Sequence, residues 1–434
     1  MTRRDFAAMP LLQAARLARP NIVWIWADNL AYQDLGCYGS TRVKTPAIDA
    51  LAQSGVRFTQ YYVAHTVCSP SRAALLTGRQ PFRNGIVDVL RPDSPTGLPA
   101  GEITIAALLK QQGYRTMAIG KWHLGDKPPH FAVDHGFDGY FGMPYSMDML
   151  PAHLYRDRQL IDDLAGEKVE TVTERYADEA IAFLRAARNG PFFLYFSHTI
   201  PHPPINLPPR ARHEGRPIYD DAIEHMDEQT GRILRTIDEL GLRDNTLIFF
   251  SSDNGPMAQG AQTGALRGRI RDAYEGGVRV PFIASWRGRI PAGRTVNDPA
   301  IAYDVFPTLA RLAGVPMPTG REYDGQDIWP LLSATGPVPR QKPFFWVYLD
   351  NVTTVRDGKW KLHVGTREKA LPEPELYDLD TDPGESRNLA SAEPAVAARL
   401  RALIAEYQKG VPHVWPLMYP VRDPRKLPSG PRRK

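Results

Sequence analysis

The chain is poor in cysteine, with only Cys37 and Cys68 among 434 residues. Two cysteines form at most one disulfide, so cysteine usage leaves the cellular compartment open. No apolar run approaches the roughly 20 residues that a membrane span needs, so no membrane-spanning segment is expected. Low-complexity tracts and internal repeats are also lacking. The net charge of +5 is spread out, without a clustered basic face or a nucleic-acid-recognition motif, which argues against nucleic-acid binding.

Length and composition indicate a globular protein, and 434 residues favour one large domain followed by a smaller one. The 40 prolines indicate many ordered loops. The first 19 residues carry a twin arginine, Arg3 and Arg4, before a weakly apolar stretch that resembles a degenerate twin-arginine export signal. This pattern predicts a periplasmic or secreted protein. The alternative is a disordered N-terminus on a cytoplasmic protein.

Strand and helix patterns alternate through the first three quarters of the chain. Continuous apolar runs predict buried strands over 21–28, 114–120, 191–198 and 246–253, with a further strand over 56–63. Between them, helices are predicted over 45–55, 102–113, 173–190 and 219–241. Such alternation indicates an α/β fold with a mostly parallel sheet sandwiched by helices. In such sheets, ligands bind beyond the carboxyl ends of the strands.

The pattern changes after Pro337. Short segments over 342–350, 353–364 and 375–390 read as strands joined by tight turns, one of them at Asp357–Gly358. An amphipathic helix is predicted over 395–410. We therefore expect a catalytic α/β domain over 20–337 and a smaller domain with an antiparallel sheet over 338–420. A basic tail follows over 421–434.

Oxygen-bearing side chains end two of the predicted strands. Asp28 and Asn29 follow the first strand, and Asp253 and Asn254 follow the last strand of the α/β region. Asp and Asn often merely turn the chain. Two such pairs at one edge of a sheet, however, can converge on a hard cation. Oxygen donors favour Ca²⁺ or Mg²⁺ over Zn²⁺, which prefers histidine and cysteine.

Basic side chains follow two other strands. Lys121 and His123 lie in GKWHLG, and His198 and His202 lie in SHTIPHPP. A lone histidine in a loop is usually a surface residue. Several histidines and a lysine at the mouth of one sheet instead indicate anion binding and proton transfer.

Cys68 opens the stretch CSPSRAALLTGR, and two interpretations stay open for it. It is either an inert buried thiol or a nucleophile at a helix start, with Arg72 one turn further on. Neither interpretation explains why Pro70 and Arg72 stand at these offsets from the cysteine.

The motifs together resemble the type I sulfatases, with arylsulfatase A-like members as the nearest pattern. The resemblance spans about Pro20 to Gly410 and rests most specifically on the cysteine motif. It is also carried by PNIVWIWADNLAYQDLGCYG, GKWHLG, SSDNG, YEGGVRVP and ELYDLDTDPGESRNLA. It implies an alkaline-phosphatase-like fold and hydrolysis of an aryl or carbohydrate sulfate ester.

The resemblance also explains the cysteine. In this family a maturation enzyme reads the Cys-x-Pro-x-Arg stretch and oxidises the cysteine to formylglycine. A thiol attacking sulfur would leave a stable adduct, whereas a hydrated aldehyde has two hydroxyls. One attacks the sulfate ester, and deprotonation of the other expels sulfate and restores the aldehyde.

Residue roles are implied in the same way. Cys68 becomes the formylglycine nucleophile and a metal ligand, and Arg72 steadies its hydrate. Lys121 and His123 bind the sulfate and the aldehyde hydroxyls. His202 protonates the leaving oxygen, for which His198 is the weaker candidate. The Ca²⁺ ligands, with Mg²⁺ as the alternative ion, are Asp28, Asn29, Cys68, Asp253 and Asn254. Cys37 is read as structural, and not as the disulfide partner of Cys68.

The sequence departs from the family pattern at two positions. The family usually has aspartate where Asn29 stands, and the loss of a negative charge should weaken calcium binding. The family also tends to place a lysine four residues before Tyr274, where this chain has Ile270. We expect Arg271, or less favourably Arg269, to supply the missing substrate-binding cation, with a guanidinium fork in place of a point charge.

Alternative functions stay open at this point. A zinc phosphatase on the same fold is disfavoured by the cysteine motif and by the Asp and Asn donors. A formylglycine-dependent phosphonate or phosphate ester hydrolase is harder to separate. A non-catalytic binder of sulfated glycans is a third alternative, against which the intact cysteine motif argues. The segment over 141–163 and the second domain are expected to shape the substrate pocket, but the sequence does not identify the ester or the oligomeric state.

Overall fold

A computed structural model of the chain describes residues 19–92 and 94–412. The predicted export signal, apart from Arg19, and the basic tail over 421–434 lie outside these residues. No helix among the described residues is long and apolar enough to cross a membrane.

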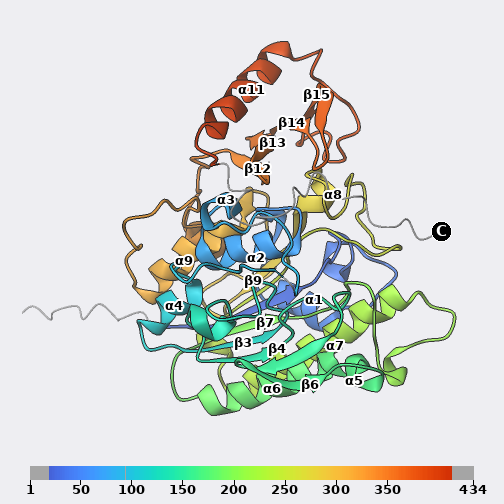
Figure 1. Cartoon of the computed structure of the whole chain (residues 1–434), viewed down its shortest axis with the longest axis vertical. Helices are drawn as coiled ribbons and strands as arrows, with labels where there is room; N and C mark the ends of the chain where they lie inside the picture. The colour runs from blue at the N-terminus through green and yellow to red at the C-terminus, as the bar shows by residue number, and fades with distance from the viewer. Residues whose placement is uncertain (1–18, 93, 413–434) are drawn as a thin grey trace, which may run out of the picture.

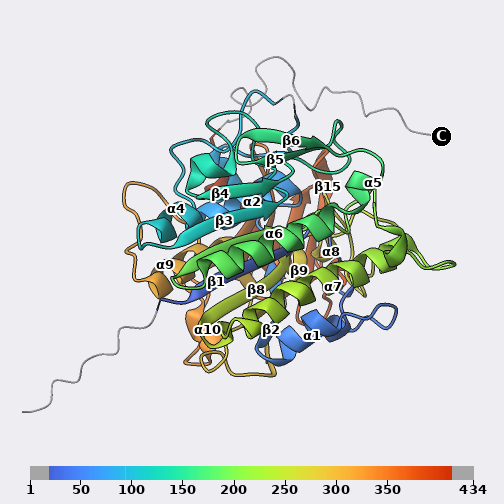
Figure 2. The ribbon, with the colours of Figure 1, turned by 90° about the horizontal axis from the view of Figure 1, so that it is seen from below.

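An eleven-stranded mixed sheet forms the larger part of the fold (Figures 1 and 2). Its centre consists of β8 (Thr246–Ser252), β1 (Asn21–Ala27), β7 (Phe192–Ser197) and β3 (Arg115–Gly120), in this order and all parallel. The antiparallel strand β9 (Arg279–Ser285) joins β8 to β2 (Val56–Tyr62). The predicted mostly parallel α/β fold is therefore confirmed.

Helices cover both faces of this sheet, which is why its strands are apolar throughout. In β1, Trp24 and Trp26 face one core, while Val23 and Ile25 face the other. The second core is covered by α1 (Pro46–Gln53), α6 (Val172–Ala187) and α7 (Ile218–Glu239), which cross the sheet in Figure 2. The first core is covered by α2 (Cys68–Thr77), α4 (Ile105–Lys110) and α9 (Val305–Ala313).

Shorter elements complete the larger domain. Its remaining strands are β4 (Gly139–Gly142), β5 (His153–Arg156), β6 (Gln159–Asp163), β10 (Arg294–Val296) and β11 (Ala300–Ile301). Its remaining α-helices are α3 (Pro81–Asn84), α5 (Glu167–Glu170), α8 (Glu275–Val278) and α10 (Trp329–Ser333). Short 3₁₀ turns are η1 (Gly36–Tyr38), η2 (Ala132–His135), η3 (Pro209–Ala211), η4 (Arg243–Asn245) and η5 (Ala302–Asp304).

The C-terminal part forms a separate four-stranded antiparallel sheet, as predicted (Figure 1, top). Its strands are β12 (Phe344–Tyr348), β13 (Asn351–Asp357), β14 (Trp360–Gly365) and β15 (Ala370–Asp378), followed by α11 (Pro394–Gln408). The turn between β13 and β14 contains Gly358 at φ 61°, a left-handed conformation that suits glycine.

A buried ion pair joins the small sheet to the larger domain. Lys361 of β14 places Nζ 2.8 Å from Oε1 of Glu275, at the start of α8, and both side chains are fully buried. The pair fixes the small sheet beside the loop that precedes α8. That loop carries Arg269 and Arg271, so the C-terminal domain helps to position it.

Candidate active site

The candidate site lies where four neighbouring parallel strands end. Strands β8, β1, β7 and β3 are consecutive in the sheet, and each is followed at once by residues singled out in the sequence. Their carboxyl ends share one edge of the sheet, the usual place for a ligand site in such folds. The topology therefore brings together side chains from distant parts of the sequence.

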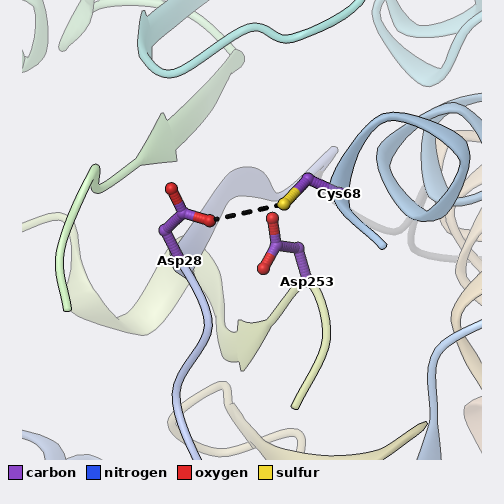
Figure 3. Close-up of side chains that lie close together, drawn as sticks. All are labelled: Asp28, Cys68 and Asp253. Atoms are coloured by element: carbon purple, nitrogen blue, oxygen red, sulfur yellow. Dashed lines mark hydrogen bonds between the residues drawn. The ribbon is translucent and has the colours of Figure 1, made fainter. Parts of the chain in front are cut away.

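Cys68 lies at the centre of this edge, as the first residue of α2 (Figure 3). Its Sγ is 3.7 Å from Oδ1 of Asp28 and 3.7 Å from Oδ1 of Asn29. One ligand atom each from Asp28, Cys68 and Asp253 lies within 4.8 Å of the others, and all three residues are buried. The residues predicted to surround a cation thus converge on Cys68.

Arg72 is held rigidly one turn into α2. Its guanidinium places Nε 3.0 Å and Nη2 2.7 Å from Oδ2 of Asp253. Nη1 donates to the backbone oxygen of Lys121 at 2.8 Å and to Oγ of Ser197 at 2.5 Å. The residue is fully buried, so these bonds compensate for the loss of water around the charge.

Lys121 forms the second buried cation of the site. Its Nζ lies 2.7 Å and 3.0 Å from the two carboxylate oxygens of Asp28 and 3.3 Å from Oγ of Ser146. Burial alone would lower the pKa of Lys121, but nearby negative groups, of which Asp28 contributes most, together raise the pKa above its ordinary value. Lys121 therefore stays charged at neutral pH.

The asparagines leave a buried amide oxygen without a partner. Nδ2 of Asn254 donates to Oδ1 of Asn29 at 2.6 Å, and Oδ1 of Asn254 has no hydrogen-bond partner among the described residues. An unpartnered buried carbonyl beside two carboxylates is unfavourable unless a cation binds there. The donors are hard oxygens, so the residues present fit Ca²⁺ or Mg²⁺ better than Zn²⁺.

The ring contacts of His123 and His202 fix their tautomers. Nε2 of His123 lies 3.0 Å from the backbone oxygen of Leu90, which only accepts, so the proton sits on Nε2 and Nδ1 carries a lone pair. Nδ1 of His202 lies 2.5 Å from the backbone oxygen of Pro203, so the proton sits on Nδ1 and Nε2 carries the lone pair. Burial and then the charge of Lys121 lower the pKa of both rings, for His202 to about 4. Both imidazoles are therefore neutral at pH 7.

His198 lies away from this cluster. It follows β7 with its side chain on the face covered by α7, where Nε2 is 3.1 Å from Oγ1 of Thr230. Its ring packs edge-on against Phe196, with 4.7 Å between centroids. The structure therefore assigns His198 to the core, as the weaker of the two histidine candidates.

Arg271 and Arg269 lie at the solvent-exposed edge of the site. The backbone N–H of Arg271 donates to the oxygen of Thr66 at 2.9 Å, two residues before Cys68, and Arg271 lines a cleft with His65 and Thr66. Arg269 is exposed and does not line that cleft. Among the described residues, Arg271 is thus the better placed of the two.

The thiol of Cys68 is not activated where it lies. Burial, and then the charge of Asp253, raise its pKa well above the ordinary value. Burial and the nearby carboxylates thus disfavour the alternative of a thiolate nucleophile at a helix start. Cys37 and Cys68 are both free, so Cys37 is not the disulfide partner of Cys68, as expected.

Sequence reasoning missed two hydroxyls at the site. Ser197 accepts from Arg72, and Ser146 accepts from Lys121. Ser197 could have been found from strand periodicity, because it shares the face of Tyr195 in β7, which is the face covered by α2. Ser146 comes from the loop after β4, and nothing in its local sequence marks it.

A mostly parallel sheet sandwiched by helices, with a buried oxygen-rich cluster and two buried cations at its carboxyl edge, is the arrangement of the alkaline-phosphatase-like fold. Comparison with known proteins refines this class. Residues 20–315 match the family model described as sulfatase. Residues 269–409 match the one described as N-sulphoglucosamine sulphohydrolase, C-terminal.

Individual relatives agree with the family models. Human arylsulfatase A is 40% identical, over 88% of this chain and 87% of that protein. N-acetylgalactosamine-6-sulfatase of Canis lupus familiaris is 32% identical, over 90% of this chain and 86% of that protein. The solved PsFucS1 sulfatase from Pseudoalteromonas sp. superposes with a TM-score of 0.82 at 26% identity, covering 93% of this chain and 92% of that one. The chain belongs to the type I sulfatase family and is a sulfuric ester hydrolase.

Proposed function

We propose that this protein hydrolyses a sulfate monoester of an aryl or carbohydrate alcohol, with formylglycine at position 68 and a Ca²⁺ ion. The observation that carries the proposal is the position of Cys68, whose Sγ lies 3.7 Å from Oδ1 of Asp28 within a buried group of oxygen donors. An unmodified thiol at this place is protonated and unreactive, which favours its role as a precursor.

The cation would be held by Asp28, Asn29, Asp253 and Asn254, together with residue 68. Ca²⁺ supplies a fixed positive charge that polarises the sulfate oxygens when it is bound, and Mg²⁺ is the alternative. The buried carboxylates supply the negative charge that such an ion needs. Arg72 and Lys121 form ion pairs with two of these carboxylates, those of Asp253 and Asp28.

Formylglycine supplies a hydrated aldehyde, with one hydroxyl to attack sulfur and a second to release sulfate. Arg72 would orient residue 68 from the next turn of α2. Lys121, with its charge retained by Asp28, would bind a sulfate oxygen, and Arg271 would add a second cation from the cleft. These positive groups offset the charge that grows on sulfate as the ester bond breaks.

The two histidines would exchange protons with the reacting groups. Nδ1 of His123 carries the lone pair and suits a base that accepts a proton from a hydroxyl of residue 68. His202 would protonate the leaving oxygen, and this requires its imidazolium form. Burial, and then the charge of Lys121, lower the pKa of His202, so a sulfate that pairs with Lys121 should raise this pKa again.

The direct test compares turnover of 4-nitrophenyl sulfate and 4-nitrophenyl phosphate by protein co-expressed with a formylglycine-generating enzyme. Mass spectrometry of the peptide containing residue 68 would report the conversion, and Cys68→Ala serves as the matched control. We expect sulfate release that scales with the converted fraction and is absent in Cys68→Ala. Preference for the phosphate would support the phosphonate or phosphate ester hydrolase instead, and binding of sulfated glycans without turnover by converted protein would support the non-catalytic alternative.

We further propose export to the periplasm, supported by the twin arginine at Arg3 and Arg4. N-terminal sequencing of protein recovered from the native host would show removal of the first residues. An intact N-terminus on cytoplasmic protein would overturn this part of the proposal.

A further inference from the structure

The motif ELYDLDTDPGESRNLA lies in the C-terminal domain, outside the cluster around Cys68. One of its residues, Glu385, lies in the turn after β15, with its side chain fully buried. Its carboxylate contacts both the small sheet and the catalytic domain. This buried acid therefore links the two domains.

Both carboxylate oxygens of Glu385 have partners. Oε2 accepts the backbone N–H of Glu275 at 2.6 Å, across the domain boundary. Oε1 lies 2.6 Å from Nε2 of His363 and 3.3 Å from Nζ of Lys361, both in β14. A carboxylate only accepts, so the proton of His363 sits on Nε2, and Nδ1 accepts the hydroxyl of Thr354 at 3.0 Å. The small sheet thus directs the carboxylate of Glu385 toward Glu275.

The turn that carries Glu385 fits closely against the catalytic domain. Glu385 adopts φ 52°, in the left-handed region that is uncommon for a residue with a side chain. Gly384 packs on the loop ahead of α8, where a Cβ would lie 2.7 Å from the backbone oxygen of Ala265. The backbone oxygen of Asp382 accepts the N–H of Glu385 at 3.1 Å and closes the turn. Such enforced conformations gather at functional sites.

Glu275 is the first residue of α8, so its N–H has no partner within the helix. Tyr274, at the N-cap position, offers no side-chain capping bond, and its hydroxyl instead donates to Oε2 of Glu375 at 2.7 Å. The carboxylate of Glu385 supplies the missing cap from the other domain. Lys361 adds its ion pair with Glu275 at 2.8 Å. The C-terminal domain therefore holds the start of α8, which lies beside the small sheet (Figure 1).

The loop that contains Arg271 rests directly on α8. At Gly277, a Cβ would overlap the backbone oxygens of Arg269 and Asp272, so the loop packs on the bare helix backbone. The N–H of Arg271 donates to Thr66 at 2.9 Å, in the segment before α2. Arg271 itself adopts φ 77°, which is uncommon for a long side chain. A shift of α8 would therefore displace Arg271.

We propose that Glu385 is a positioning residue for the sulfatase reaction, which holds the start of α8 and thereby sets Arg271 against the sulfate of the ester. The inference rests on the proposed function, in which Arg271 binds that sulfate. Glu385 acts through Glu275 and the loop, without contact to the substrate. Loss of its carboxylate would leave the N–H of Glu275 uncapped and allow the loop to move.

A double-mutant cycle between Glu385 and Arg271 tests the inference. In protein that contains formylglycine, Glu385→Ala should reduce kcat/KM for 4-nitrophenyl sulfate by about fivefold to tenfold, close to the loss expected for the Arg271 contact itself. In an Arg271→Ala background, the same substitution should change kcat/KM by less than about twofold, because residues that act through one contact are not additive. A purely structural role would reduce kcat/KM by the same factor in both backgrounds.

Asp378→Ala is the matched control. Asp378 is a buried acid of the same motif, but its carboxylate pairs with Lys359 at 2.6 Å and not with the start of α8. Its loss should leave kcat/KM within about twofold of the wild type, because independent sites act separately.

Glu385→Gln tests whether the cap is the contact that matters. Its amide oxygen can still accept the N–H of Glu275, and His363 can present a lone pair to the amide N–H by moving its proton to Nδ1. Since the cap is kept, kcat/KM should stay within about threefold of the wild type. If Glu385→Ala does not fold, Glu385→Asp withdraws the carboxylate by one methylene and takes its place in the cycle.

Hydrogen exchange reports on the loop without turnover. In Glu385→Ala, a peptide covering residues 267–277 should exchange at least about tenfold faster than in the wild type, whereas Asp378→Ala should leave it unchanged. An additive cycle, a Gln variant as impaired as the Ala variant, or unchanged exchange would overturn the inference. Wild-type protein that contains formylglycine but releases no sulfate would refute the proposed function, while exchange would still decide whether Glu385 holds the loop.

Discussion

Arg72 places two nitrogen atoms on a single carboxylate oxygen of Asp253, Nε at 3.0 Å and Nη2 at 2.7 Å, with both side chains fully buried. Asp253 ends β8 and Arg72 belongs to α2, so this pair fixes the helix that carries Cys68 onto the sheet. The carboxylate keeps its other oxygen for the backbone N–H of Asn29, at 3.1 Å. The pair therefore aligns three parts of the candidate site at once.

Removal of one partner of this pair should destabilise the protein more than removal of both. Arg72→Met leaves Asp253 buried without its partner, and we expect a loss of about 3–5 kcal/mol in the free energy of unfolding. Arg72→Met/Asp253→Leu should lose less, because no charge stays unpaired. Urea denaturation in the presence of chelator measures both. Similar losses for the single and double variants would mean that packing, not charge, dominates.

Asn29→Asp should tighten calcium binding. The substitution adds a negative charge next to Asp28 and Asp253 without changing the size of the side chain, and we expect Kd to fall by about tenfold. Asp28→Asn removes a charge from the same cluster and should have the opposite effect. Calorimetric titration of Ca²⁺ into each variant, after a chelator has removed bound metal, measures both dissociation constants. Unchanged or weaker binding by Asn29→Asp would contradict Asn29 as a ligand.

Arg271→Ala should reduce kcat/KM for 4-nitrophenyl sulfate by about tenfold or more, the effect of a lost charge-assisted contact to sulfate. Arg269→Ala is the matched control, two residues away on an exposed side chain outside the cleft. It should change the rate by less than about twofold. If the double alanine variant kept full activity, neither arginine would replace the lysine usual in the family.

His198 should make the protein less stable as the pH falls. Burial lowers its pKa to about 3 in the folded chain, against 6.5 in the unfolded chain. The unfolded state therefore binds more protons between these values. The contribution of His198 to the free energy of unfolding is fully present above pH 6.5. It is lost as the pH falls from 6.5 toward 3. Between pH 7 and pH 5 the loss is about 2 kcal/mol.

His198→Gln keeps a partner for Thr230 but does not titrate. Urea denaturation at pH 7 and pH 5 should show a smaller drop in the free energy of unfolding for this variant than for the wild type. The same change at the partly exposed His153 serves as the control, and the effect of His198→Gln should exceed that of His153→Gln. Equal drops for His198→Gln and wild type would show that the histidine does not titrate on unfolding.

Strand periodicity explains why the sequence placed some site residues and not others. Asp28 and Asp253 follow apolar runs long enough to mark buried strands, so their position at the sheet edge could be predicted. His198 and His202 stand in one loop and look equivalent in the sequence. Successive side chains of a strand point to opposite faces, and β7 continues this alternation into His198, which faces α7. The family resemblance favoured His202, and the assignment of faces supplies the physical reason for the difference.

The sequence predicted that the second domain helps to shape the substrate pocket, but not which residues line the cleft between the domains. Among these residues, Arg367 lies almost 280 residues from Asp88, the carboxylate with which it pairs. No periodicity or motif links the two. Their contact depends on how the small sheet packs against the larger domain, through pairs such as Lys361 and Glu275.

The sequence by itself determined the alternation of strands and helices, the chemical types of the site residues and the family to which their spacing belongs. These properties are local, because hydrophobic periodicity and motif spacing act over short stretches of chain. The tertiary structure alone decided which carboxylate Arg72 binds, that His198 packs against α7 and that the C-terminal domain forms one wall of a cleft. Those outcomes depend on contacts between distant segments, which are fixed only when the burial of apolar faces brings the segments together.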